Sequence, residues 1–248
     1  MVEFNMRADG SAGTRHHNGE DHGEPLRWGE ELATLVDGQK LIELEPRRIV
    51  REPGERIDSI YVLQSGLISF LSGDDRSALE TGTVAQGGVV GSSIVLGATT
   101  GQYQAMVLLT ASAWRVPAEH FLAEYHKSFA LRRYVNRHLE WELFQARQNA
   151  LCHGVHSSEE RFCRWLLRAS DSINSSELPL TQNVCAQALG LQRTTVAGTA
   201  HALQMSGLIQ TRRGRITILD RPELEKRACA CWDSLRSYAD RAGSPAGD

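Results

Sequence analysis

The sequence predicts an α+β fold, in which an N-terminal antiparallel β-roll of the jelly-roll type is followed by a long helix and a C-terminal winged helix-turn-helix. Three observations support this prediction. Short apolar runs separated by Gly and Pro fill residues 41–117, which is typical of short antiparallel strands. From Glu119 the apolar residues recur at helical spacing, and two short helical patterns flank Gly190 near the end of the chain.

These patterns divide the 248 residues into four segments. We expect a flexible tail over 1–24, a β-roll sensor domain over 25–118, helices over 119–154 and a winged helix-turn-helix domain over 155–248. The tail is expected because it holds few apolar residues and cannot bury enough surface to offset the entropy of ordering.

The composition excludes several classes of protein. With 41% hydrophobic and 23% charged residues, the chain has the balance of a globular protein rather than a disordered one. No apolar run reaches the length of a membrane span, and the N-terminus lacks the apolar segment of a signal peptide. The odd number of cysteines, five, favours free thiols in a reducing compartment. We therefore expect a cytoplasmic protein without a membrane partner.

The β-roll is expected from strands of about four to six residues that are punctuated by turn residues. Closure of the roll would protect the edges of such short strands. The glycines expected at its turns are Gly54, Gly66, Gly73, Gly82, Gly88 and Gly91.

Two helices should follow the β-roll. Pro117 precedes the first, and a longer helix is expected from about Ser128 to Cys152. Apolar side chains cover more than one stripe of this long helix, so one face should pack on its own domain and the other on a second subunit of a homodimer. The expected dimer contacts are Leu131, Val135, His138, Leu139 and Glu142.

The winged helix-turn-helix is predicted from the segment Leu178–Asp220. Thr181 can cap a short helix that ends at Leu189, and Gly190 can adopt the positive φ of a tight turn. A second helix is expected over Arg193–Ser206. Two strands joined by the sequence Arg-Arg-Gly-Arg should then form the wing.

The charge distribution indicates a polyanionic partner. The net charge of the chain is −3, but residues 178–219 contain four arginines and no Asp or Glu. By domain, residues 1–154 carry −5 and residues 155–248 carry +2. A local positive potential of this kind is what binding to nucleic acid requires, so we expect double-stranded DNA as the partner.

This organisation resembles the cyclic-AMP receptor / fumarate-nitrate regulator (Crp/Fnr) family of bacterial transcription factors. The resemblance covers about residues 25–235 and is most specific in LTQNVCAQALGLQRTTVAGTAHALQMSGLIQTRRGRITILD and in HSSEERFCRWLL. The glycines Gly54, Gly66, Gly88 and Gly91 fit the family's cyclic-nucleotide-binding type of roll. The resemblance implies a regulator that binds a pseudo-palindromic operator as a homodimer, with RNA polymerase as a possible further partner.

The family's recognition helix enters the major groove, so the resemblance implies roles for particular residues. The implied base contacts are Gln192, Arg193, Thr194 and Gly198, and the implied phosphate contacts are Thr181, Gln182, Thr195 and Arg213. An Arg at the base-reading position can bind guanine O6 and N7 together. Thr194 and Gly198 stand where relatives often carry longer polar side chains, so the half-site should differ from that of the cyclic-AMP receptor.

The resemblance also implies a sensor site in the β-roll, but its cyclic-nucleotide cassette is altered. The family uses Gly-Glu followed by Arg-Ser/Thr-Ala, whereas this chain has Ser92 for the Glu and Tyr103-Gln104 for the Arg-Ser. No basic residue lies between Gly87 and Leu109, so a phosphate would lack its charge partner, which argues against cyclic AMP. Ser92, Tyr103 and Gln104 are the expected lining of a pocket for an unknown effector.

The cysteines do not indicate a cofactor at this stage. An oxygen-sensing iron–sulfur cluster needs four thiolates, usually near the N-terminus, and no Cys precedes Cys152. Cys229 and Cys231 are close in sequence but lack a matching second pair. We therefore expect neither an iron–sulfur cluster nor a metal site.

Two other classes of function stay open from the residues alone. A jelly roll can be a cupin-like enzyme, but residues 41–117 contain no His or Cys to hold its metal, and the chain has no GxSxG, HExxH or GxxxxGK[ST] motif. We therefore expect no enzymatic activity. The winged helix could instead belong to a signalling or scaffold module that binds protein or RNA.

Overall fold

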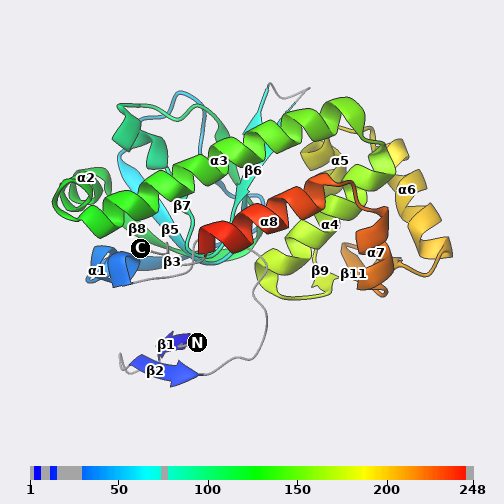
Figure 1. The fold of residues 1–248 in the computed structure, drawn as a ribbon, viewed down its shortest axis with the longest axis horizontal. Coiled ribbons are helices and arrows are strands. Elements are labelled where there is room, and N and C mark those ends of the chain that lie inside the picture. Colours follow the sequence, from blue (N-terminus) through cyan, green and yellow to red (C-terminus); the bar gives the residue numbers. More distant parts are fainter. Residues whose placement is uncertain (1–2, 7–11, 16–29, 74–77, 244–248) are drawn as a thin grey trace.

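The computed structural model describes residues 3–6, 12–15, 30–73 and 78–243, and Figure 1 shows its arrangement. Within the expected tail, β1 (Glu3–Met6) and β2 (Ala12–Arg15) pair as antiparallel strands. The other residues of the 1–24 segment lie outside the described residues. Among the described residues, no helix combines the length and the apolar character that crossing a bilayer requires.

The N-terminal domain is an antiparallel β-roll, as predicted. Helix α1 (Glu30–Val36) leads into a sheet with the strand order β3-β8-β5-β6. Two short strands complete it: β4 pairs with β8, and β7 pairs with β5. The elements are β3 (Lys40–Leu44), β4 (Ile49–Arg51), β5 (Ser59–Ser72), β6 (Leu79–Val84), β7 (Val89–Val90), the short 3-10 helix η1 (Ser92–Leu96) and β8 (Gln104–Pro117).

The central strands are longer than the sequence predicts. Strands β5 and β8 each run for 14 residues, and Gly66 lies inside β5. Gly82 lies inside β6, so the prediction that these two glycines form turns is wrong. Gly66 instead absorbs an irregularity in the pairing of β5 with β8 and has a φ of 87°. A Cβ atom at this position would lie 2.3 Å from the carbonyl oxygen of Thr110, so only Gly fits where the two strands approach.

Helix α2 (Ala118–Lys127) follows Pro117, and the long helix α3 (Phe129–Val155) runs along the β-roll (Figure 1). The hydroxyl of Ser128 caps α3 by accepting a hydrogen bond from the backbone N–H of Leu131 at 3.1 Å. The helix continues through Gly154, three residues beyond the end that the sequence predicts.

Most of the expected dimer contacts on α3 face the chain's own β-roll, which corrects that prediction. Leu131, Val135 and His138 are at most 2% exposed, and Leu139 packs against the same core. The Nε2 atom of His138 accepts a hydrogen bond from the backbone N–H of Val89 at 3.1 Å. Glu142 is tied to the same domain as well, since its carboxylate accepts a hydrogen bond from Ser92 Oγ at 2.8 Å. These residues therefore form the face of α3 that packs on the chain's own domain, and the expectation that they contact a second subunit is wrong.

The C-terminal domain is the predicted winged helix-turn-helix. Its helices are α4 (Ser158–Ile173), α5 (Gln182–Leu189), α6 (Arg193–Met205), α7 (Arg221–Arg227) and α8 (Cys231–Gly243), and its sheet has the order β10 (Ile209–Arg212), β11 (Arg215–Ile218), β9 (Glu177–Leu178). A capping box begins α4: Ser157 and Glu160 each accept a hydrogen bond from the other's backbone N–H. Helix α8 returns along α3 (Figure 1), where the ring of Tyr238 stacks on Trp141 and Phe144 with centroids 5.4 and 4.4 Å apart.

One buried apolar cluster extends across both domains. Leu67 and Leu109 of the β-roll belong to the same buried cluster as Phe162 and Leu166 of α4. The turn at Gly190 also approaches the roll, because a Cβ atom there would lie 2.5 Å from the side chain of Leu79.

A buried carboxyl group lies in this contact between the domains. Glu80 of β6 accepts hydrogen bonds from Ser69 Oγ at 2.7 Å and from Trp165 Nε1 of α4 at 3.0 Å. Burial raises the pKa of Glu80 from 4.5 to about 7, against the opposing effects of these hydrogen bonds and of Arg164 and Arg168.

Candidate nucleic-acid interface

The helix-turn-helix forms through local signals in the sequence. Thr181 caps α5, since its hydroxyl accepts a hydrogen bond from the backbone N–H of Val184 at 3.3 Å. Gly190 ends α5 in the left-handed conformation with a φ of 59°, which confirms the predicted turn. Helix α6 then begins at Arg193, as predicted, and ends one residue earlier than expected.

Helix α6 has one buried and one exposed face. Val196, Ala200 and Leu203 are fully buried and hold the helix on the domain core. The opposite face is exposed at Thr194, Gly198, Ala202 and Met205. The sequence-predicted base contacts Thr194 and Gly198 therefore lie where a duplex could reach them.

The N-terminus of α6 is open to an acceptor. Its capping residue, Gln192, makes no side-chain hydrogen bond to the first turn, and this turn contains no acidic residue. The first backbone N–H groups of a helix lack intrahelical partners and carry a partial positive charge. An anion or an acceptor atom of a base would satisfy them.

The wing is a tight hairpin. Strands β10 and β11 pair from Ile209 with Ile218 to Arg212 with Arg215, so the turn consists of Arg213 and Gly214 alone. It is shorter than the four-residue connection that the sequence predicts, because Gly214 adopts a φ of 73° and permits a two-residue turn.

A basic groove of about 500 Å³ lies between the start of α5, the start of α6 and the wing. It brings together four residues with sequence-predicted DNA contacts: Thr181, Gln182, Arg193 and Arg213. Its complete lining is Leu180, Thr181, Gln182, Asn183, Arg193, Thr211, Arg212, Arg213, Gly214, Arg215 and Ile216. The lining therefore contains four arginines and no acidic residue.

One of these arginines is neutralised from outside the groove. Arg215 forms an ion pair with Glu177 of β9, the acidic residue just before the acid-free segment. Arg193, Arg212 and Arg213 have no carboxylate partner in the part of the chain that the structure describes. Gln192, Thr194, Thr195 and Gly198 are exposed beside the groove and do not line it.

The residues expected to line an effector pocket are occupied by partners from their own domain. Ser92 is fully buried, and its hydroxyl donates to Glu142 of α3 at 2.8 Å. The ring of Tyr103 stacks on Phe70 at 4.1 Å, and burial raises the pKa of its hydroxyl well above the usual range. The amide of Gln104 donates to Glu52 at 2.9 Å.

A cation that the sequence did not indicate lies beside this region. Arg51 of β4 is 3% exposed, and its guanidinium donates to the backbone carbonyl groups of Arg56 and Ser59. It also approaches Gly91 and lies near Tyr103. Arg51 precedes Gly91 by forty residues, so the sequence of the cassette does not reveal that a buried cation lies beside it.

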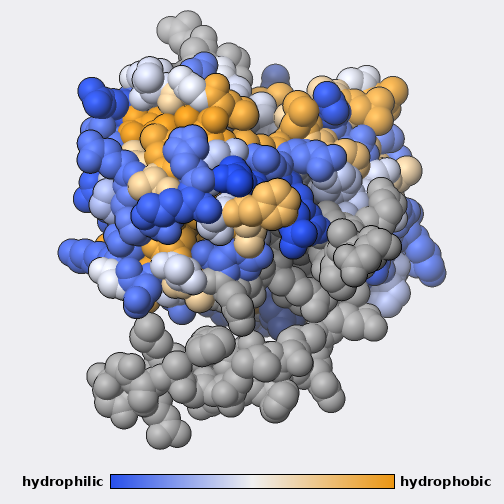
Figure 2. All heavy atoms as spheres, turned by 60° about the vertical axis from the view of Figure 1, so that its left-hand side comes forward, coloured by the Kyte–Doolittle hydropathy of each residue, from blue (hydrophilic) through white to orange (hydrophobic). Residues whose placement is uncertain are grey.

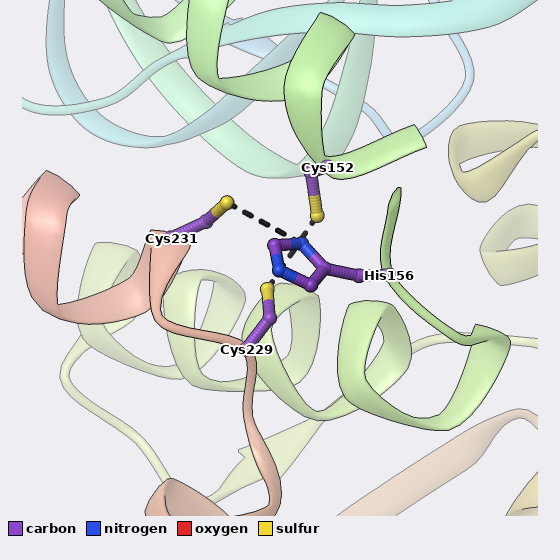
Figure 3. A group of neighbouring side chains, drawn as sticks. All are labelled: Cys152, His156, Cys229 and Cys231. Atoms are coloured by element: carbon purple, nitrogen blue, oxygen red, sulfur yellow. Dashed lines mark hydrogen bonds between the residues drawn. The ribbon is translucent and has the colours of Figure 1, made fainter. Parts of the chain in front are cut away.

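The structure also joins cysteines that are distant in sequence. Cys152 and His156 meet Cys229 and Cys231, and the four possible ligand atoms all lie within 4.8 Å of one another (Figure 3). The sequence assigned no metal site because Cys229 and Cys231 lack a nearby second pair. The pairing depends on the packing of α8 on α3, which no local pattern reveals.

Comparison with known proteins agrees with this architecture. Residues 41–128 match the model of the cyclic nucleotide-binding domain, and residues 160–227 match that of the Crp-like helix-turn-helix domain. None of the curated proteins matches the chain in sequence.

Solved structures share the fold at low sequence identity. FixK2 from Bradyrhizobium japonicum is 16% identical over 77% of this chain and 98% of its own, with a TM-score of 0.67. A transcriptional regulator of the CRP/FNR family from Thermus thermophilus is 22% identical over 76% and 98%, with a TM-score of 0.65. The c-di-GMP responsive global regulator CLP of Xanthomonas campestris is 16% identical over 77% and 99%, with a TM-score of 0.64. With its nucleotide-binding type of roll followed by a Crp-like helix-turn-helix, the chain belongs to the Crp/Fnr family of DNA-binding transcriptional regulators.

Proposed function

We propose that this regulator binds a pseudo-palindromic duplex operator as a homodimer, with α6 in the major groove. The observation that carries the proposal is the acid-free groove, in which Arg193, Arg212 and Arg213 lack carboxylate partners among the described residues. Arginines without a carboxylate partner can neutralise DNA phosphates, and the counterions that were condensed on those phosphates are then released, which favours binding.

The groove suits the phosphate backbone. Thr181 and Gln182 lie at the start of α5, opposite Arg213 at the tip of the wing. A groove lined by side chains and helix N-termini can contact phosphates from two sides. Such contacts determine the register of the protein on the duplex.

Base recognition would come from the start and the exposed face of α6. Arg193 lies at the first helical position, where it lines the groove and can extend toward a guanine edge. Thr194 and Gln192 flank it on the exposed surface. Gly198 leaves the next turn of this face without a side chain, and a Cβ atom there would meet nothing within 4 Å.

The homodimer would use the exposed face of α3, which differs from the face expected from the sequence. One series of its exposed positions recurs at steps of three or four along the helix: Phe129, Arg133, Asn136, Glu140, Leu143, Arg147, Leu151 and Val155. Phe129, Leu143 and Leu151 are 69%, 49% and 52% exposed, which is unusual for large apolar side chains on one helix face. Figure 2 shows that apolar residues gather over the upper part of one face of the molecule.

A regulatory signal would act at the β-roll, because the winged helix domain packs directly on it through Trp165 and Gly190. Cyclic AMP is not the signal that we propose, since Ser92 and Tyr103 stand where the family carries the Glu and the Arg that hold it.

Selection of binding sites from a random duplex library tests the proposal. The wild-type protein should select an inverted repeat whose halves lie about one helical turn apart. Arg193→Ala should lose preference at defined base pairs, whereas Arg213→Ala should weaken binding to all sequences alike and reduce the salt dependence by about one phosphate contact. Arg56→Ala, at an exposed arginine of the β-roll, is the matched control and should bind as the wild type does.

Two results would overturn the proposal. One is an Arg193→Ala variant that selects the same motif with unchanged preference. The other is wild-type binding to single strands as tight as to duplex, which would favour the RNA-binding alternative.

A further inference from the structure

Two distant segments of the chain meet beside the junction of the domains. Cys152 lies in the last turn of α3 and His156 directly follows this helix, while Cys231 is the first residue of α8 and Cys229 lies two residues before it. Figure 3 shows the three thiols arranged around the imidazole ring. The stacking of Tyr238 on Trp141 and Phe144 holds α8 along α3, so the meeting depends on a packed interface and not on a loop.

Two of the six distances between the ligand atoms match those around one tetrahedral zinc ion, and the other four are at most 4.8 Å. Zinc–sulfur bonds of about 2.3 Å at tetrahedral angles place two sulfurs about 3.8 Å apart, and a sulfur and an imidazole nitrogen about 3.6 Å apart. In this protein Cys152 Sγ lies 3.5 Å from Cys229 Sγ, and Cys231 Sγ lies 3.6 Å from His156 Nδ1. All four ligand atoms fit within 4.8 Å.

The surroundings also suit a closed metal site. Cys152, Cys229 and Cys231 are 0%, 3% and 2% exposed, and they form a small buried cluster of their own. Three thiolates and a neutral imidazole on a divalent ion leave a net charge of −1. Arg164, which is 6% exposed and interacts electrostatically with all three thiols, can balance this charge.

Other uses of these residues fit less well. A disulfide needs sulfurs about 2.05 Å apart, whereas all five cysteines are free here. A [4Fe–4S] cluster places its ligands on four different irons, so their atoms must lie farther apart than ligands on one ion.

We propose that Cys152, His156, Cys229 and Cys231 bind one Zn²⁺ in a closed Cys₃His site. All four positions would be filled by the protein, which is the arrangement of structural rather than catalytic zinc. The ion would fasten the start of α8 to the end of α3, next to Ser157, where the winged helix domain begins. This proposal does not depend on how the protein recognises DNA.

Zinc binding to the full-length chain tests the proposal directly. The reduced, chelator-treated protein is titrated with Zn²⁺ against a competing chelator, and its metal content is then measured by elemental analysis. We expect one zinc per chain. Cys229→Ala should weaken binding by more than about 100-fold, since even the loss of a group that only supports a ligand costs 10–100-fold.

Matched variants separate the loss of a ligand from the loss of a buried thiol. Cys163→Ala removes a fully buried thiol outside the cluster and should still bind one zinc. His156→Cys should retain the ion as a Cys₄ site, whereas His156→Ala should not. If an alanine variant fails to fold, the wild type with Co²⁺ still decides, because cobalt bound by thiolates in a tetrahedral site shows intense visible and near-ultraviolet absorption.

The outcomes against the proposal are specific. Zinc content equal in the wild type and in the Cys229→Ala/Cys231→Ala double variant would overturn it. So would a wild type that binds less than one zinc per five chains at saturation, or one that takes up iron with stoichiometric inorganic sulfide in place of a single ion.

Discussion

Replacing Glu80 by Gln tests the contact between the β-roll and the winged helix domain. Glu80 is buried, and its two oxygens accept hydrogen bonds from Ser69 and Trp165. Gln has nearly the same shape and can keep both hydrogen bonds, because its oxygen accepts from Trp165 while its N–H donates to the hydroxyl of Ser69. The substitution therefore removes an ionisable group and changes little else.

The expected effect follows from the pKa of Glu80. Since burial raises it from 4.5 to about 7, the folded protein holds a proton that the unfolded chain releases between these values. The stability contributed by neutral Glu80 is therefore complete below pH 4.5 and is lost as the pH rises through 7. With these two pKa values, the loss between pH 5 and pH 8 is about 2–3 kcal/mol.

Urea denaturation followed by tryptophan fluorescence measures this loss. Other groups titrate over the same range, so the informative quantity is the difference in free energy of unfolding between Glu80→Gln and the wild type. This difference should move by about 2–3 kcal/mol in favour of the variant from pH 5 to pH 8. Glu45→Gln, at an exposed glutamate, is the control for the loss of one charge. A difference that stays flat, or that moves in favour of the wild type, would refute the reasoning.

Three further substitutions test single positions by thermal or urea denaturation. Gly66→Ala should cost at least about 2 kcal/mol, because φ is positive and the new Cβ atom would collide with the backbone of Thr110; unchanged stability would contradict the strand bulge. Ser157→Ala should cost about 1 kcal/mol through loss of the capping box with Glu160, and restoration by Ser157→Asp would confirm capping as the cause. Gly198→Ala should stabilise α6 by about 0.5–1 kcal/mol, because a Cβ atom at this helical position meets nothing within 4 Å. The added methyl group should also change the selected motif if this face of α6 meets the bases as proposed, and an unchanged motif would remove Gly198 from the base contacts.

The parts of the fold that were predicted well depend on local sequence. The Ser157 cap, the left-handed turn at Gly190 and the start of α6 at Arg193 each follow from interactions within a few residues. The basic, acid-free character of residues 178–219 was likewise readable from local sequence, whereas the groove that these residues line appears only in the structure.

The parts that were predicted poorly depend on contacts between distant segments. The apolar stripe containing Leu131 and Val135 covers the chain's own β-roll, and periodicity alone cannot distinguish this partner from a second subunit. Glycine is a common turn residue, so the sequence alone suggests a turn at Gly66. Its role in the irregular pairing of β5 with β8 depends on the position of β8, which is distant in sequence. The meeting of Cys152 with Cys229 bridges 77 residues and follows from the packing of α8 on α3.

The contact between Gly190 and Leu79 makes this glycine a spacer as well as a turn. A Cβ atom at position 190 would lie 2.5 Å from Cδ1 of Leu79, the far end of a flexible and partly exposed side chain, so Leu79 would have to turn aside to admit it. The φ of 59° would add backbone strain for any residue other than Gly. Gly190 thus lets the turn before α6 lie directly against β6, so one residue serves both the helix-turn-helix and the contact between the domains.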